Sequence, residues 1–503
     1  MIWHIFKKDF RLLWRFAAVV AVLEFLAVSV LYQADHGGFD GRRTSALLNV
    51  LVVLQLIGSA ALAAAAVHSD AVPGVRQDWL VRPIPRRDLL SAKVLFVVLV
   101  VQGPMLIADI VGAMASGVPF GEMIAATIIR DLCMLVALYL PVLAFASLTS
   151  SLTENIVAIV IAVAAYSLFS TAVNALKTFG GSSMATSGVE WLAELALLFV
   201  AGVGAATVLI FQFTKRRTIR ARWLTTGIAL LCMFANMPPW RPLFAIQQRL
   251  SPVPGAAAAV QLRFAPELGG VRGNRSGTFN GQSITSVALP MEISGVPPDT
   301  VLRADRIQVR MSTPHLLDMD LDASAPAPLG KTMYATTLVE AREYSEYRGR
   351  PVRVDLDYSL TLLRLTDAHV VPALHDWMNI PGFGRCETRL VHMKTALQLH
   401  CLMDQNTPPC ATLFLENPAT GKRNPPVNAC SGQYTPLYTQ YLPDALRRAM
   451  IDMPLRDTAD AAYPIDLAQV YDSRVVMRFY QPVEHFTRHL GIPDDRLNDW
   501  ASQ

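Results

Sequence analysis

The sequence predicts an α-helical polytopic membrane domain with six or seven transmembrane helices, followed by a β-rich, sandwich-like soluble domain. Residues from about Phe16 to Trp240 form a succession of apolar runs, and a helix needs roughly 20 apolar residues to cross a bilayer core of about 30 Å. After Trp240 the apolar runs give way to polar and apolar residues in alternation, and this part holds four of the six cysteines.

Composition agrees with this division. The chain has 503 residues, of which 52% are hydrophobic and 17% charged, whereas about a quarter of a typical soluble protein is charged. The net charge of +4 is small and gives no reason to expect a nucleic-acid partner. Met1–Arg15 continues into the first apolar run without a small-residue cleavage site, so we expect that run to be retained.

Seven segments are candidate transmembrane helices. The seventh is the weakest, because its apolar stretch of about 14 residues, Leu224–Met237, also suits a buried or interfacial segment. Trp223 and Trp240 bracket it as interfacial aromatic residues do. The candidates are Phe16–Gln33, Ala46–Val67, Val94–Ala115, Asp131–Leu148, Ile156–Ala175, Trp191–Phe213 and Trp223–Trp240.

Three domains follow from these boundaries: residues 1–15, 16–240 and 241–503. The first is a short helix with apolar residues at i, i+3, i+7 and i+10 and basic residues on its other faces, which is typical of a helix lying in the membrane interface. A plain extension of the first span is the alternative. The second domain is the transmembrane domain, and the third is the β-rich domain.

Basic residues predict the orientation. Fourteen Lys and Arg residues fall in the N-terminal segment and in the loops around 76–93 and 215–222, against four in the opposite set of segments, which are Arg42, Arg43, Arg130 and Lys177. The positive-inside rule places the richer set in the cytoplasm. With seven spans, residues 241–503 then lie outside the cytoplasm, at a bacterial-type inner membrane.

Strict alternation predicts strands in the third domain. Val352–Leu362 alternates apolar and polar residues over its whole length, Val287–Ile293 and Ile307–Met311 do so over shorter stretches, and Val475–Tyr480 is a further candidate. A turn at 294–300 separates two of them. We expect an antiparallel sandwich, with helical pieces near Asp444–Ile451 and Pro482–Leu490.

The third domain carries Cys386, Cys401, Cys410 and Cys430. An even number of cysteines outside the cytoplasm favours disulfides. Four cysteines allow three connectivities, and we prefer the sequential one, Cys386–Cys401 with Cys410–Cys430, because it closes short loops. A zinc site is disfavoured because there is no Cys-x-x-Cys pair.

Motifs for catalysis are absent from the sequence, so we expect no enzyme and no cofactor bound by this chain. Gly330-Lys-Thr332 has the end of a P-loop, but Ala325 stands where its first glycine is needed. His485 and His489 have i, i+4 spacing without the glutamate of a His-Glu-x-x-His site, so we expect them on a solvated helix face. No metal site is expected.

Polar residues inside the spans are candidate functional residues, since a charge in hydrocarbon is costly and faces a partner or a cavity. They are Glu24, Gln55, Asp109 and Asn174. Each could line a translocation path. The alternative is a structural hydrogen bond or a packed carboxyl between helices.

The segment 75–93 between the second and third spans is the most specific in the chain. Pro83 and Pro85 keep the preceding residues extended, and Asp88 can serve as a cap or first-turn acid for the helix that continues into the third span. A short helix before the prolines would place Trp79 at the membrane surface. A stiff basic link of this kind can transmit a push from a soluble partner into the membrane.

This segment resembles the ATPase-docking loop of permease subunits in type-2 (ABC-2) ATP-binding cassette transporters. Arg82-Pro-Ile-Pro-Arg-Arg-Asp-Leu-Leu-Ser-Ala-Lys93 fits the loop, and Thr149–Asn155 fits the family's short loop between the fourth and fifth spans. The resemblance covers about residues 1–215. It implies coupling through Trp79, Arg82, Pro83, Pro85, Arg86, Arg87 and Asp88.

The resemblance further implies an exporter whose ATP is bound by a separate ATPase subunit, and a second copy or sister permease as partner. A seventh span and an external domain depart from the family's basic plan. An ordinary basic connector is the plain alternative for the loop. A membrane-anchored receptor or assembly factor, acting through its external domain, is the alternative function, and the substrate is not indicated.

Overall fold

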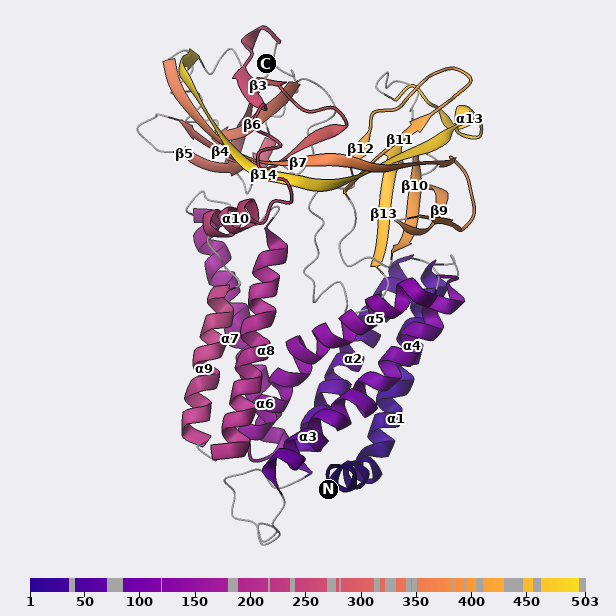
Figure 1. The fold of residues 1–503 in the computed structure, drawn as a ribbon, viewed down its shortest axis with the longest axis vertical. Coiled ribbons are helices and arrows are strands. Elements are labelled where there is room, and N and C mark those ends of the chain that lie inside the picture. Colours follow the sequence, from indigo (N-terminus) through magenta and orange to yellow (C-terminus); the bar gives the residue numbers. More distant parts are fainter. Residues whose placement is uncertain are drawn as a thin grey trace.

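The computed structural model describes a helical domain and a β-rich domain. Figure 1 shows the helices below and the strands spread across their upper end, with the N terminus at the far, lower end. The described residues are 1–35, 41–69, 85–118, 120–179, 189–215, 218–235, 240–268, 277–279, 282–311, 317–321, 332–340, 345, 351–381, 383–391, 395–403, 410–428, 447–455 and 463–496.

Five helical stretches in the N-terminal half are long and apolar enough to cross a membrane. They lie within α1 (Ile2–Asp35), α2 (Gly41–His68), the continuous run from α3 (Arg86–Phe96) to α4 (Gly103–Ala115), the run from α5 (Phe120–Met134) to α6 (Leu140–Leu148), and α8 (Glu190–Lys215). They match five of the expected spans, which confirms a polytopic helical membrane domain.

Two further helices occupy the places of the remaining expected spans. The helix α7 (Leu152–Phe179) has 28 residues and includes the fifth expected span. The helix α9 (Thr218–Ala235) has 18 residues, packs beside α8, and starts five residues before the seventh expected span. Trp240 belongs to a separate helix, α10 (Trp240–Arg249), and not to the end of that span.

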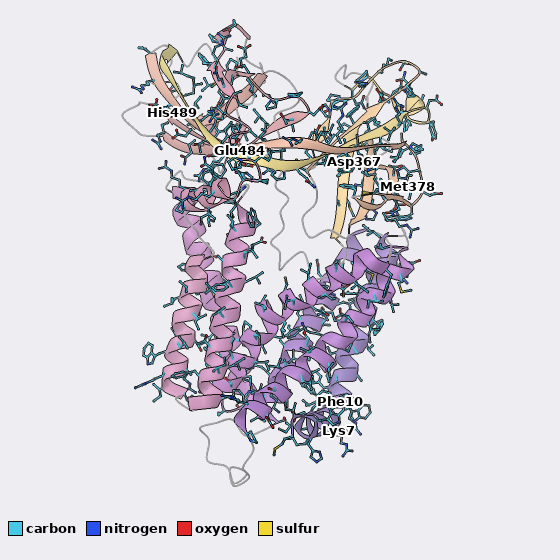
Figure 2. The ribbon with its side chains drawn as sticks, in the orientation of Figure 1. Lys7, Phe10, Asp367, Met378, Glu484 and His489 are labelled. Carbon is cyan, nitrogen blue, oxygen red and sulfur yellow. A yellow bond between two sulfur atoms is a disulfide. The ribbon has the colours of Figure 1, made fainter. Side chains whose placement is uncertain are left out.

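The N-terminal segment is continuous with the first span within α1. In Figure 1 its first turns lie crosswise at the foot of α1, near the start of α3, before the chain turns upward. Trp3 and Phe10 are exposed on this segment, and the Lys7 ammonium lies 5.6 Å from the centre of the Trp3 ring. Figure 2 places Lys7 and Phe10 at the end of the helices farthest from the strands.

Two of the membrane helices contain a π-helical stretch followed by a proline. Val97–Gln102 precedes Pro104, and Leu135–Tyr139 precedes Pro141. A proline inside a helix removes one backbone hydrogen bond and collides with the carbonyl four residues before it. Widening the preceding turn to the π form relieves that collision and leaves carbonyl groups for other donors.

Small residues let the membrane helices approach closely. A Cβ on Gly202 of α8 would lie 2.5 Å from the Val136 side chain, and a Cβ on Gly204 would lie 2.6 Å from the Ile228 side chain of α9. Small residues are typical of helix contacts in membranes because they bring the backbones together. These two glycines position α8 between α9 and the span that contains Val136.

The described residues of the C-terminal half form three antiparallel sheets, which confirms a β-rich domain. One sheet contains β1 (Gln261–Phe264), β2 (Gly277–Phe279), β3 (Gln282–Ser294) and β6 (Thr332–Glu340). The second contains β8 (Met378–Ile380), β9 (Gly384–Val391), β10 (Ala396–Met403) and β13 (Arg447–Pro454). The third contains β4 (Thr300–Met311), β5 (Leu317–Leu321), β7 (Pro351–Pro372), β11 (Cys410–Glu416), β12 (Val427–Asn428) and β14 (Arg474–Arg496). The strand β1 is followed by the 3₁₀ turn Pro266–Leu268, and the short helix α13 (Leu467–Val470) precedes β14.

Two strands of the third sheet are exceptionally long. The strands β7 and β14 have 22 and 23 residues and pair antiparallel over almost their whole length. Figure 1 shows them crossing the top of the molecule from one side to the other. One end of this pair contributes Tyr358 and Phe486 to a core with β3 and β4, and the other end contributes Met477 to a core with β10, β11 and β13.

The expected strands are present. Val354, Leu356 and Tyr358 are buried and Asp355 and Asp357 are not, as the alternation required, whereas every residue of 358–363 is buried. The expected turn joins β3 to β4, with Gly295 and Asp299 at positive φ. A Cβ on Gly295 would collide with the backbone of Ala259, so glycine is required there by the close approach as well as by φ.

Two expected helical pieces are wrong. Residues near Asp444–Ile451 contribute to β13, and Pro482–Leu490 lies inside β14. His485 and His489 are therefore on a strand and not on a helix. His489 is exposed beside Asp357, while His485 is buried. The long antiparallel pairing of this segment with β7 outweighed its local helical spacing.

The three described cysteines of this domain are held in disulfides. Cys386 and Cys401 are bonded to each other and face each other across β9 and β10, which confirms that pair. Cys410 is also held in a disulfide, and Cys430 lies outside the described residues. Cys133 and Cys232, in the membrane helices, are free thiols.

Among the described residues, the β-rich domain contacts the membrane helices at the turn between α4 and α5. There Arg385 of β9, in the second sheet, donates to the backbone carbonyl of Ser116. The helix α10, at the start of the C-terminal domain, packs against the middle of β14. Glu484, which Figure 2 labels on β14 above α10, accepts hydrogen bonds from the backbone of Gly255 and Ala257 at 2.8 and 2.5 Å.

Candidate functional site

The described part of the expected docking segment begins at Pro85, directly before α3. Pro85 and Arg87 are exposed, and Asp88 is half-buried in the first turn of the helix, which is the first-turn position that the sequence predicted. The backbone of Arg86 begins α3, but its side chain lies outside the described residues. Trp79, Arg82 and Pro83 also lie outside them.

A buried ion pair lies where this segment enters the membrane domain. The Lys93 ammonium on α3 is 2.6 Å from Asp9 Oδ2, and both side chains are almost completely buried. Ser69, one residue beyond α2, donates to Asp9 Oδ1 at 2.8 Å and accepts from Lys93 at 3.2 Å. Asp9 belongs to the N-terminal segment, so three separate parts of the chain meet at this point.

Ser69 and Lys93 stand on either side of residues 70–84, which include the first part of the expected docking segment and lie outside the described residues. Asp9 binds both side chains, so it links the end of α2 to α3 and to the N-terminal turns of α1. We call Asp9, Ser69 and Lys93 the basal cluster.

Polar contacts continue from the basal cluster to the other helices at this end. His68 Nε2 lies 3.4 Å from Thr149 Oγ1, in the connection between α6 and α7. The carbonyl of Leu148, which ends α6, accepts from Arg222 of α9 at 2.9 Å, and the neighbouring Ser147 carbonyl accepts from Gln212 of α8 at 3.1 Å. These side chains satisfy carbonyl groups at a helix end that otherwise have no partner.

The connection between α6 and α7 is shorter than the sequence suggested. It comprises Thr149–Ser151, because Leu152 already begins α7. The Ser151 hydroxyl accepts from the backbone N–H of Glu154 at 3.2 Å, and the Glu154 carboxylate accepts from the backbone of Ser150 at 2.7 Å. This reciprocal capping starts the helix early, so the last four residues of the expected loop, 152–155, are helical.

A second buried cluster lies within the bundle. Arg130 of α5 donates to Asp109 of α4, and its guanidinium is 3.8 Å from the Glu24 carboxylate of α1. The exposed fractions of these three residues are 4% or less. We call Glu24, Asp109 and Arg130 the intramembrane cluster. Both carboxyls of this cluster face a buried cation and not lipid.

The π-helical stretches border the intramembrane cluster. Gln102, the last residue of the first stretch, donates to the backbone carbonyl of Asp131 at 2.5 Å, one turn before the second stretch. Gln55 of α2 is buried and its amide lies 3.8 Å from the Met105 sulfur. Asn174 belongs to α7, but its side chain lies outside the described residues.

The prediction for Arg130 is wrong. The sequence analysis places it in a loop with three other basic residues, whereas it is the eleventh residue of α5 and is fully buried. The signal that could have found it is the apolar run on both sides, Met123–Ile129 and Leu132–Leu148, which extends the fourth span toward the N terminus. Asp9 and Lys93 were also missed, because nothing local reveals a partner 84 residues away.

The described residues hold no group of three or more His, Cys, Asp or Glu side chains suited to a metal ion. Gly330 and Lys331 lie outside the described residues. Both clusters instead consist of ion pairs between helices, which can hold helices in place or exchange partners when the helices move. Comparisons with family models, with curated proteins and with solved structures found no match to this chain.

Proposed function

We propose that this chain is the membrane-spanning permease subunit of an ABC-2 type ATP-binding cassette exporter, coupled through residues 75–93 to a separate ATPase subunit. The N terminus would lie in the cytoplasm of a bacterial-type cell, and the β-rich domain would lie outside it. A second copy or a sister permease would complete the transporter. ATP would bind to the partner subunit.

The basal cluster is the observation that carries this proposal. A loop that receives a push from an ATPase must be attached firmly to the helices that move. Ser69 and Lys93 flank residues 70–84 and are joined to each other and to Asp9 by bonds of 2.6 to 3.2 Å. Breaking a buried ion pair by removing one partner costs about 3–5 kcal/mol, so this attachment resists separation.

The arrangement of the two ends supports the same proposal. The N-terminal segment and the start of α3 are at one end of the helices, and the β-rich domain is at the other (Figures 1 and 2). Those basic residues of the richer set that the structure describes belong to the first end. The disulfide Cys386–Cys401 belongs to the second, as expected for an oxidising compartment.

Charge reversal in the docking segment tests the proposal. Arg86→Glu together with Arg87→Glu should release a co-purified ATPase, because losing one charge of a desolvated contact pair costs about 2–5 kcal/mol. Arg42→Glu together with Arg43→Glu is the matched control, since these residues begin α2 at the opposite end from His68. Association would be measured by pull-down from membranes and coupling by ATP hydrolysis.

Replacing the two prolines tests the stiffness of the segment separately from its charge. Pro83→Ala with Pro85→Ala keeps every basic residue, so it should reduce stimulated hydrolysis more than binding. If the double Arg reversal leaves ATPase association and hydrolysis intact, the permease proposal is wrong. The anchored receptor, acting through the β-rich domain, would then be the better explanation.

A further inference from the structure

The helix α10 has two different faces, and the first packs into the β-rich domain. Phe244 and Gln247 are buried, with exposed fractions of 2% and 3%. The Gln247 amide lies 3.0 Å from His485 Nδ1, in the interior of the third sheet. Trp240 stacks on Phe244 with the ring centres 4.7 Å apart and lies 4.9 Å from the Arg306 guanidinium.

The second face is apolar and exposed. Ile246 is 45% exposed, Leu250 is 59% exposed, and Val253, just beyond the helix, is 45% exposed. Arg249 is exposed among them. An apolar face with a basic residue at its edge is typical of helices that lie in the membrane interface, where the apolar side chains enter the acyl boundary and the cation meets anionic headgroups.

The position of α10 indicates that its exposed apolar face meets the membrane surface. The helix begins at Trp240, five residues after α9 ends at Ala235, and five residues span at most about 18 Å. Figure 1 shows α10 lying across the upper ends of the helices, directly beneath the sheet. Since α9 packs beside α8, a helix long and apolar enough to span the membrane, its upper end is close to the bilayer surface.

We infer that α10 is a second interfacial helix, whose Ile246, Leu250 and Val253 enter the phospholipid bilayer while its opposite face carries the β-rich domain. The partner of this surface is the lipid headgroup and upper acyl region. The helix therefore anchors the third sheet to the membrane, and the sheet stays close to the bilayer at the middle of β14, where His485 lies. This inference does not depend on the proposed transport function.

The segment after α10 supports this role, because it is fixed to the same strand. Ser251 accepts from the backbone of His485 at 3.0 Å, and the backbone of Val253 donates to the carbonyl of Val483 at 3.0 Å. Arg488 donates to the carbonyl groups of Ala257 and Val260 at 2.7 and 3.0 Å. Ile246, Leu250 and Val253 are therefore presented by a backbone that is hydrogen-bonded to the sheet.

Site-directed fluorescence in nanodiscs tests the inference. Cys133 and Cys232 are first replaced by Ala, which leaves the disulfides as they are. A single cysteine is then introduced as Ile246→Cys or Leu250→Cys and labelled with an environment-sensitive dye. Tyr471→Cys is the control, because Tyr471 is 69% exposed beside α13, which Figure 1 places away from the helices.

The expected result is that lipids with brominated acyl chains quench most of the fluorescence at Ile246 and Leu250 and almost none at Tyr471, whereas aqueous iodide does the reverse. Two outcomes would overturn the inference. Labels on α10 that iodide reaches as readily as it reaches Tyr471 would show a water-exposed face. Labels that neither quencher reaches would show a face covered by protein, such as a second copy of the chain.

Discussion

The guanidinium of Arg385, on β9, donates to the backbone carbonyl of Ser116, in the turn between α4 and α5. Two features place Arg385 there. Its guanidinium lies 5.9 Å from the Trp377 ring, and its neighbour Cys386 is tied to Cys401. The next residue of the turn, Gly117, has φ +72° and gives the guanidinium room, because a Cβ at that position would overlap it.

Replacing Gly117 with Ala should therefore separate the two domains at this point. The substitution introduces both a collision with Arg385 and an unfavourable φ, which costs about 1 kcal/mol or more by itself. Hydrogen exchange of the backbone around 114–118 should increase. Gly121→Ala is the control, since a Cβ at Gly121 meets nothing within 4 Å. Equal exchange in both variants would show that Arg385 does not hold the turn.

Removing one charge from the basal cluster should strongly reduce the stability of the folded protein. Lys93→Met leaves the Asp9 carboxylate buried beside Ser69, and we expect the free energy of unfolding to fall by about 3–5 kcal/mol. Thermal unfolding in detergent would measure it. Lys8→Met is the control, because Lys8 is largely exposed and lies 3.7 Å from the same carboxylate. If both variants lower the unfolding temperature by a similarly small amount, Lys93 does not form a buried ion pair with Asp9.

The intramembrane cluster permits a test by compensation. Arg130→Met leaves Glu24 and Asp109 without this buried cation, so the protein should insert poorly or unfold at lower temperature. Adding Glu24→Gln and Asp109→Asn removes the charges and should restore much of the yield of folded protein. If the triple variant is as unstable as Arg130→Met alone, then packing and not charge explains the effect.

His485 predicts a dependence of stability on pH. Burial lowers the pKa of His485 below its ordinary value of 6.5, Arg303 adds to the lowering, and Asp305 and Glu484 oppose it. The unfolded chain therefore binds the proton first as the pH falls. The stability that this residue contributes is present above about pH 6.5 and is lost as the pH falls through the folded-state pKa.

We expect His485→Asn to remove part of this acid dependence, as measured by thermal unfolding at a series of pH values. The Thr361 hydroxyl, 2.7 Å from His485 Nδ1, and the Gln247 amide are the groups that must rearrange when the ring is charged. His489→Asn, at an exposed position, is the matched control. An identical pH profile for wild type and His485→Asn would refute the prediction.

The disulfide Cys386–Cys401 closes a loop with a sequence separation of 15 residues. Loop-closure entropy for this length amounts to about 3 kcal/mol, so a reductant should lower the unfolding temperature of the β-rich domain. A Cys133→Ala, Cys232→Ala protein should respond to the reductant in the same way as wild type. Thiol labelling of Cys386 and Cys401 in the folded protein without a reductant would contradict the bond.

The sequence predicted best where one physical signal dominates a segment. Length and hydropathy located the spans, and strict alternation located β7 and β14 in part, because burial on one side of a strand repeats every second residue. The prediction of a helix at 482–490 was wrong. The spacing of His485 and His489 suits a helix, but this segment pairs as a strand with β7, more than 100 residues earlier in the chain.

The clusters could be predicted only in part. Glu24 and Asp109 were found because a carboxyl in an apolar run is conspicuous, yet Arg130 was missed because it was placed beyond the end of a span. Asp9 and Lys93 each had an ordinary local explanation, as polar residues of an interfacial helix and a basic loop. Their pairing depends on how α1 and α3 pack, which local sequence does not encode.

The pairing of β7 with β14 has a consequence for motion. These strands run without interruption between the core that contains Cys386 and the core that contains Tyr358, and β14 packs against α10 near its middle. A hydrogen-bonded ribbon therefore joins the part of the domain that binds the α4–α5 turn, through Arg385, to the part that packs against α10. The paired backbones of β7 and β14 thus couple any movement of the α4–α5 turn to α10.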